Sequence, residues 1–176
     1  MLKRPYNFES LVLFDIDGTL NTGIENDEVV QFFLDRNYAV GISTANPSYH
    51  PRNLMSFDWM PANLYMFMAN HNFNTFNNVG SNILCGEYNP EMYNYDLNTD
   101  MYTSIGVRKG ISLGETAYKY GITDPKKCFL FDNDPAYLHG CFLYNNQFNL
   151  VCAGRPCGKE NMSTNTIYNF LHRKTL

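Results

Sequence analysis

Two acids follow a run of apolar residues near the start of the chain, in the stretch LVLFDIDGTL at 11–20. A short apolar run of this kind suits a strand that is buried on both faces. Asp15 and Asp17 come directly after the run and flank Ile16, so an extended backbone would point both carboxylates to one side. Gly18 then allows the chain to leave in a turn. Because buried carboxylates are costly, the pair predicts a site where a metal ion, a lysine or backbone amides compensate the charge.

The same stretch resembles the first motif of the haloacid dehalogenase (HAD) superfamily, whose phosphatase branch carries Asp-x-Asp-x-Thr or Val after a hydrophobic strand. The family's second motif is a hydroxyl at the end of the next strand, which donates a hydrogen bond to a phosphoryl oxygen. Here the predicted strand YAVGIS is followed by Thr44. Thr44 is the better match because the family's hydroxyl follows the last apolar strand residue, and Ser43 is the alternative contact to substrate. Outside this context, Ser-Thr before Asn-Pro indicates a turn.

A cation follows further along the chain, as the family's third motif requires. Lys109 precedes the run CFLFDNDPAY at the spacing that separates the family's lysine from its fourth motif. Arg108 is a competing cation and a candidate substrate contact. Without this context, the lysine would be interpreted as solvated surface.

The acids of that run, Asp132 and Asp134, flank Asn133 at the end of another predicted strand. The family's fourth motif supplies metal ligands, and the form Asp-Asn-x-Pro-Ala also resembles the capless C-terminal-domain phosphatases, in which the asparagine takes a metal position. The resemblance implies Asp132 and Asn133 as ligands, with Asp134 in reserve. The Asp15 side chain and the Asp17 carbonyl would complete an oxygen-rich site for Mg²⁺. Taken alone, Asp-Asn-Asp-Pro indicates a turn and a helix cap.

The activity that the resemblance implies is magnesium-dependent hydrolysis of phosphate monoesters through an aspartyl-phosphate. Asp15 would attack phosphorus, and Asp17 would protonate the leaving group and later deprotonate water. Lys109 and Thr44 would hold the negative phosphoryl oxygens. The alternatives are a nucleotidase, a 3'-phosphatase for nucleic-acid ends, and a catalytically silent phosphate-binding module.

An unusual stretch, 47–61, carries Tyr49, His50, Arg52 and Trp59 just past a predicted strand end. Ligands of α/β proteins bind at such ends. The stretch is therefore either a specificity loop, with Arg52 contacting substrate, or an aromatic loop that packs against the body of the protein.

The elements that must position these residues alternate between strands and helices, which predicts an α/β fold: a Rossmann-like parallel sheet with helices on both faces. All motifs then lie at one edge. Besides the first strand and the run CFLFD, strands are predicted at 38–43, 79–85 and 148–153. Helices are predicted at 28–37, 62–70, 111–120 and 135–144, with a short one in 165–176. The stretches 21–27 and 71–78 are predicted loops, 86–101 is unassigned, and Arg155 is either a substrate contact or a surface residue.

Size and composition bound the class of protein. With 176 residues, the chain predicts a single domain, 1–176. The net charge of −4 argues against extended duplex binding. The five cysteines are odd in number and form no Cys-x-x-Cys pair, so neither a disulfide framework nor a zinc knuckle is indicated. Neither a membrane span nor a signal peptide is recognisable. We therefore expect a soluble, cytoplasmic protein.

The space between motifs limits any cap domain. HAD phosphatases that act on small metabolites often carry a cap after the first motif or between the second and the third. The stretch 21–27 is too short for one, and 45–108 must already supply a core helix and a strand. The sequence therefore predicts a capless or minimally capped core. Its phosphorylated substrate would be macromolecular, or a neighbouring subunit of an oligomer would act as the lid.

Overall fold

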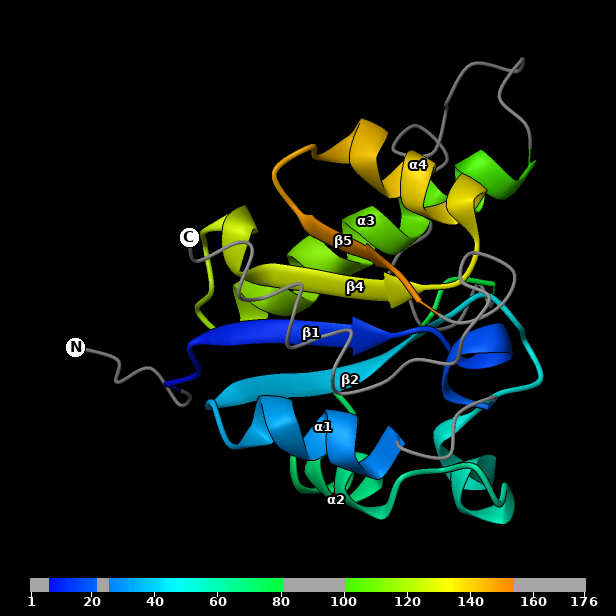
Figure 1. Cartoon of the computed structure of the whole chain (residues 1–176), viewed down its shortest axis with the longest axis vertical. Helices are drawn as coiled ribbons and strands as arrows, with labels where there is room; N and C mark the ends of the chain where they lie inside the picture. The colour runs from blue at the N-terminus through cyan, green and yellow to red at the C-terminus, as the bar shows by residue number, and fades with distance from the viewer. Residues whose placement is uncertain (1–6, 22–25, 81–100, 154–176) are drawn as a thin grey trace.

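Five parallel strands form one sheet in the computed structural model, which describes residues 7–21, 26–80 and 101–153. The strand order across the sheet is β3-β2-β1-β4-β5, and all strands run in the same direction (Figure 1). The strands are β1 (Ser10–Phe14), β2 (Tyr38–Thr44), β3 (Phe76–Asn78), β4 (Cys128–Asp132) and β5 (Asn149–Cys152). The chain reverses its strand order between β3 and β4, where it crosses the sheet to place β4 beside β1. Ligands of open α/β sheets bind at such a switch point.

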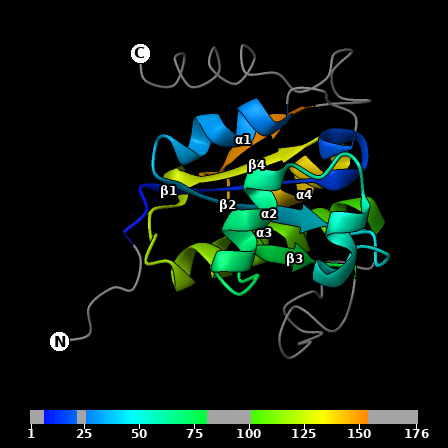
Figure 2. The same ribbon diagram turned by 90° about the horizontal axis from the view of Figure 1, so that it is seen from below.

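Helices cover both faces of this sheet, as Figures 1 and 2 show. The pair α1 (Asn26–Leu34) and α2 (Ala62–Asn70) packs on one face, and the pair α3 (Met101–Lys119) and α4 (Pro135–Tyr144) packs on the other. Three short helical turns, η1 (Ile16–Leu20), η2 (Pro51–Ser56) and η3 (Pro125–Lys127), complete the described elements. This architecture confirms the predicted α/β fold with a Rossmann-like sheet.

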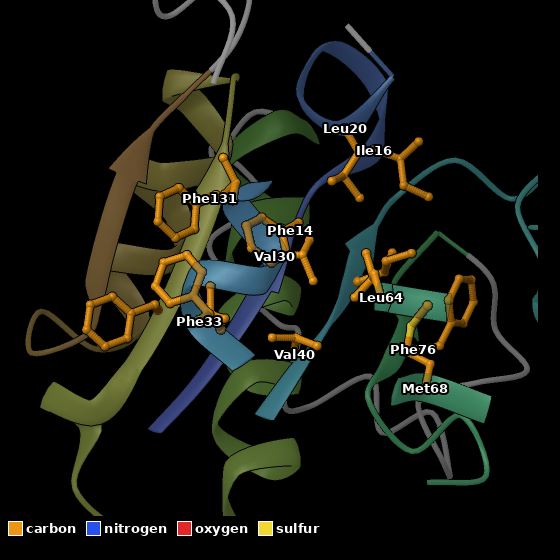
Figure 3. Packing of buried hydrophobic residues seen from close by; sticks show 14 of the residues in the cluster. Phe14, Ile16, Leu20, Val30, Phe33, Val40, Leu64, Met68, Phe76 and Phe131 are labelled. Atoms are coloured by element: carbon orange, nitrogen blue, oxygen red, sulfur yellow. The ribbon is translucent and has the colours of Figure 1, made fainter. Parts of the chain in front are cut away.

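Successive side chains of a strand point to opposite faces of the sheet, and this divides the core into two clusters. In β1, Val12 and Phe14 face α1 and α2, whereas Leu11 and Leu13 face α3. Figure 3 shows Phe14 with Phe33 of α1 and Phe131 of β4, and the rings of Phe14 and Phe131 stack with centroids 5.3 Å apart. Both faces of β1 are therefore buried, which explains why its sequence is a continuous apolar run.

The same alternation determines where the acids at the strand ends point. Asp15 follows the parity of Leu11 and Leu13, and Asp132 follows the parity of Cys128 and Leu130, which also face α3. Two acids on neighbouring strands are thereby turned toward the same helix.

The third strand lies upstream of its predicted position. The strand predicted at 79–85 is wrong for residues 79 and 80, and the loop predicted at 71–78 is wrong for its last three residues, because β3 is Phe76–Asn78. Val79 follows the strand and its amide donates to the Thr44 carbonyl at 2.8 Å. Two asparagines have weak strand propensity, but pairing with β2 fixes them in the sheet. Residues 81–85 lie outside the described residues.

The helix that carries Lys109 is longer than predicted. It begins at Met101, so the predicted start at residue 111 is wrong. Gly106 and Gly110 lie inside it because α4 packs against this part of α3. A Cβ atom on Gly106 would lie 2.1 Å from the Tyr137 carbonyl oxygen, so the close helix contact requires the missing side chain.

The remaining elements agree well with prediction. The helices predicted at 62–70 and 135–144 coincide with α2 and α4, and α1 lies two to three residues upstream of its predicted range of 28–37. The predictions for 165–176, for Arg155 and for most of 86–101 fall outside the described residues. No helix among the described residues has the length and apolar character to cross a membrane.

The cysteines depart from expectation at one position. Cys128 and Cys141 are buried free thiols, whereas Cys152, at the end of β5, is disulfide-bonded. The sequence pattern alone indicated no disulfide, because the spacing of cysteines along a chain does not report which sulfur atoms the fold brings together.

Candidate functional site

A buried lysine connects the ends of two strands. The ammonium of Lys109 lies 2.9 Å from Asp15 Oδ1 and 2.6 Å from Asp132 Oδ2, and its side chain is fully buried. The Asp15 amide donates to the Phe131 carbonyl at 2.8 Å, which keeps the ends of β1 and β4 side by side. Lys109 reaches both acids from the middle of α3, whereas the sequence predicted it at the start of a helix. We call Asp15, Lys109 and Asp132 the buried triad.

Burial and charge oppose each other in the buried triad. Burial disfavours the charged ammonium, but the charges of Asp132 and Asp15 outweigh that effect and raise the pKa of Lys109 above its ordinary value. Burial raises the pKa of Asp15 to about 7, against the attraction of Lys109 and together with the repulsion of Asp132. Two carboxylates thus share one cation, and the site favours an additional positive charge or a proton at Asp15.

The turn after β1 raises the second acid out of the core. The turn is a single π-helical turn, in which the Leu20 amide donates to the Asp15 carbonyl at 3.3 Å. Gly18 has a φ of 82°, a conformation that suits glycine. Asp17 is exposed at this turn, whereas Asp15 has only 4% of its surface exposed. The two acids therefore differ in environment, as a nucleophile and a proton carrier would require.

Three side chains hold the carboxylate of Asp17. The Tyr49 hydroxyl donates to Oδ1 at 2.7 Å, Asn46 Nδ2 donates to Oδ2 at 3.0 Å, and Asn21 Nδ2 donates to Oδ1 at 3.3 Å. Burial, followed by the hydrogen bond to Asp17 and its charge, raises the pKa of Tyr49 above its ordinary value, so the phenol stays a donor. Sequence reasoning missed Asn46 and the role of Tyr49. Their position directly after a strand end was the one available signal.

A cleft of about 320 Å³ opens above these groups at the carboxyl edge of the sheet. It is lined by Asp15, Asp17, Thr44, Ala45, Asn46, Ile105, Asn133, Asp134 and Tyr137. The structure therefore brings together the predicted Asp15, Asp17, Thr44 and Asn133, while Lys109 and Asp132 are fully buried next to Asp15. Ile105 and Tyr137, which the sequence did not single out, add an apolar wall from α3 and α4.

The predicted substrate contacts lie elsewhere. Ser43 belongs to the other parity of β2, is fully buried, and makes no hydrogen bond through Oγ within the described part of the chain. Arg52 is exposed on η2, and Arg108 is half-buried beside Lys109 on α3. None of the three is among the side chains that line the cleft. Thr44, one step along the strand, is the hydroxyl that faces it.

The aromatic loop packs against itself. The rings of Phe57 and Trp59 stack with centroids 5.3 Å apart, and Tyr49 meets the Trp59 ring edge-on at 5.8 Å. Tyr49 is 8% exposed. Base stacking needs an exposed ring, so the geometry of Tyr49 agrees with the packing interpretation of 47–61 and not with a stacking platform.

The donor atoms around the cleft fit magnesium. In the described ranges, no three His, Cys, Asp or Glu side chains converge as a metal-binding group. Mg²⁺ however keeps several waters and is commonly held by one or two carboxylates. Asp15, Asp17 and Asn133 line the cleft, and the Asp15 and Asn133 side chains with the Asp17 carbonyl would supply such oxygens. Both carboxylate oxygens of Asp132 already have partners: Oδ2 pairs with Lys109, and Oδ1 accepts a hydrogen bond from the Asp134 amide at 2.9 Å.

A larger cleft, about 460 Å³, lies at the other end of the sheet, near the starts of β4 and β5. Its walls are mainly apolar and aromatic, with Tyr118, Ile122, Tyr144 and Phe148 among them. The smaller cleft is the candidate active site, because the carboxyl groups of Asp15 and Asp17, the side-chain amides of Asn46 and Asn133 and the Thr44 hydroxyl belong to residues that line it.

Comparison of the chain with protein-family models, with curated proteins and with solved structures finds no match.

Proposed function

We propose that the protein is a magnesium-dependent phosphate-monoester hydrolase of the HAD type. The observation that carries this proposal is the buried triad at the carboxyl edge of the sheet, with Asp17 held beside it over an open cleft. A nucleophile, a fixed cation and a positioned acid are the groups that phosphoryl transfer through an aspartyl-phosphate needs.

The first half-reaction transfers the phosphoryl group to Asp15. Oδ1 of Asp15 is held by Lys109, so Oδ2 attacks phosphorus while the bond to the leaving oxygen breaks. Asp17 gives its proton to that oxygen, and an alcohol departs. The Thr44 hydroxyl accepts from the Asn46 amide at 3.2 Å, which leaves its own proton to donate to a phosphoryl oxygen.

The second half-reaction restores the enzyme. Asp17, now ionised, takes a proton from water, and the water oxygen attacks the phosphorus of the aspartyl-phosphate. The bond to Asp15 breaks and inorganic phosphate leaves. Lys109 offsets the charge on Asp15 throughout, and bound magnesium would supply further positive charge to the phosphoryl oxygens.

The experiment measures release of phosphate from para-nitrophenyl phosphate with Mg²⁺, before and after chelation. We expect turnover that chelation abolishes and that added Mg²⁺ restores. As a control for Asp→Asn substitution, Asp35→Asn, at an exposed turn residue just after α1, should leave turnover unchanged. A protein that binds phosphate but never turns it over would be the silent phosphate-binding module.

The substrate class follows from access to the cleft. The described residues between β2 and α3 form η2, α2 and β3, and these belong to the core. We infer that the cleft, which no cap covers within the described residues, accepts phosphate on a macromolecule or a chain end. A panel of phosphopeptides, end-phosphorylated oligonucleotides and small phosphometabolites tests this. Efficient hydrolysis of the small esters alone, by a monomer, would refute it.

A further inference from the structure

We propose that Tyr49 is a positioning residue for Asp17, and that Asn78, at the end of β3, holds the backbone of Tyr49 in place. This inference rests on the proposed function, because it assigns a role in delivering the proton to the leaving group. It concerns the loop after β2, which sequence reasoning treated as a substrate contact or as packing.

Asp17 needs such a support because its own backbone leaves it on the surface. The residue lies in the π-helical turn after β1, where Asp17 and Gly18 have non-helical backbone angles. An exposed carboxylate on a turn samples several rotamers, and the proton reaches the leaving oxygen from only some of them. The shortest of its side-chain contacts is the one to the Tyr49 hydroxyl, at 2.7 Å.

Packing fixes the Tyr49 ring more firmly than the other two donors. The ring is buried against Phe57 and Trp59, with centroids 5.3 and 5.8 Å away. Asn21 is exposed and Asn46 is half-buried, so both retain more freedom. A phenol hydroxyl can also donate or accept. Tyr49 therefore keeps its contact whether Asp17 carries the proton or has given it away.

Asn78 ties this loop to the sheet. Its side-chain amide donates to the carbonyls of Asn46 at 2.8 Å and of Tyr49 at 3.0 Å, and its side chain is buried at the end of β3. One buried amide thus holds the backbone of both loop residues that bind Asp17. The edge strand β3 has little apolar content, but through Asn78 it serves to orient Asp17.

The test compares Tyr49→Phe with wild type on two substrates, phenyl phosphate and 2,4-dinitrophenyl phosphate. The phenolate of the first needs a proton to leave, whereas the nitrated phenolate does not. We expect kcat/KM, which reports transfer of the phosphoryl group to Asp15, to fall about tenfold for phenyl phosphate and to be unchanged for the dinitrophenyl ester. In an Asp17→Asn background, adding Tyr49→Phe should cost nothing further, since the acid is already gone. Tyr65→Phe, on α2, is the matched control.

Asn78→Ala provides a second route to the same signature, with folding of each variant followed by circular dichroism. Equal losses on both substrates, in folded Tyr49→Phe, would overturn the positioning role while leaving the phosphatase proposal standing. Additive losses in the Asp17→Asn background would overturn it as well. Wild type that hydrolyses neither ester would instead remove the proposed function, and this inference with it.

Discussion

Asp15 is the residue on which the proposed chemistry depends most directly. Asp15→Asn keeps the size of the side chain and its place between Lys109 and the cleft, but replaces the carboxylate with an amide, which is not nucleophilic enough to attack phosphorus. We expect turnover of para-nitrophenyl phosphate to fall to background while the circular dichroism spectrum is unchanged. Retained turnover in the folded, magnesium-saturated variant would show that another group attacks phosphorus.

Asp17 should show a dependence on the leaving group. Asp17→Asn removes the proton donor without changing shape, so alkyl phosphates should lose about two to four orders of magnitude in kcat/KM, which reports the first half-reaction. Esters with acidic leaving groups should lose much less. A loss that stays constant across leaving groups would contradict the role of Asp17 as the acid.

Lys109 should matter for stability as well as for catalysis. Lys109→Met leaves two buried carboxylates without their cation, at a cost of about 3–5 kcal/mol in the free energy of unfolding. Adding Asp132→Asn removes one of the unpaired charges and should recover part of the loss. Urea denaturation of the two variants measures both values, and a double variant no more stable than the single one would argue against this account.

At the scale of the element, the contact between α3 and α4 sets the width of the cleft. Gly106→Ala would bring a Cβ atom to 2.1 Å from the Tyr137 carbonyl oxygen, so α4 must shift. We expect a loss of about 1–3 kcal/mol in stability and a lower kcat, because Tyr137 lines the cleft from α4 and Asp134 lines it from the N-cap of that helix.

Gly114→Ala on the same helix is the control for that substitution. Its new Cβ atom would lie 3.6 Å from the Phe148 ring, an ordinary contact. Since alanine favours helix over glycine by about 0.5–1 kcal/mol, this variant should be as stable as wild type or more so. If both variants behaved alike in thermal unfolding, the helix contact would not be the cause.

Elements with a clear pattern were predictable, and contacts between distant segments were not. The range of α4 follows from proline at its first turn and an acid before it, and the range of α2 follows from its apolar spacing. The start of α3 was missed because Gly106 suggests a break, and only the neighbouring helix explains it. Likewise, β3 has an asparagine-rich sequence, and its place depends on pairing with β2.

In the candidate site, too, some residues could be predicted from the sequence and others could not. Residues at strand ends, such as Asp15, Thr44 and Asp132, could be located from the sequence because a parallel sheet brings strand ends together. The contact of Tyr49 with Asp17 joins residues 32 positions apart through a loop of irregular shape. No periodicity encodes such a contact.

At the scale of the whole molecule, the pH should control stability through Asp15. Its pKa is about 7 in the folded protein and about 4 in an unfolded chain, so the folded state binds the proton more tightly. As far as this group is concerned, stability of the metal-free protein should be highest below about pH 4, where Asp15 is protonated in both states. It should fall by up to about 1.4 kcal/mol per pH unit as the pH rises toward 7. Thermal unfolding in chelator measures this slope, and Asp15→Asn should remove that contribution. An equal slope in both proteins would contradict it.

The pairing of β1 with β4 also has a consequence for synthesis on the ribosome. Lys109 follows Asp15 by 94 residues, and Asp132 follows Lys109 by another 23. At about 5–20 residues per second, β1 waits on the order of ten seconds for its second neighbour. During that interval one edge of an apolar strand stays unpaired, and for most of it Asp15 lacks Lys109. A nascent chain that stops before β4 therefore presents an unpaired strand edge, which is prone to pair with other chains.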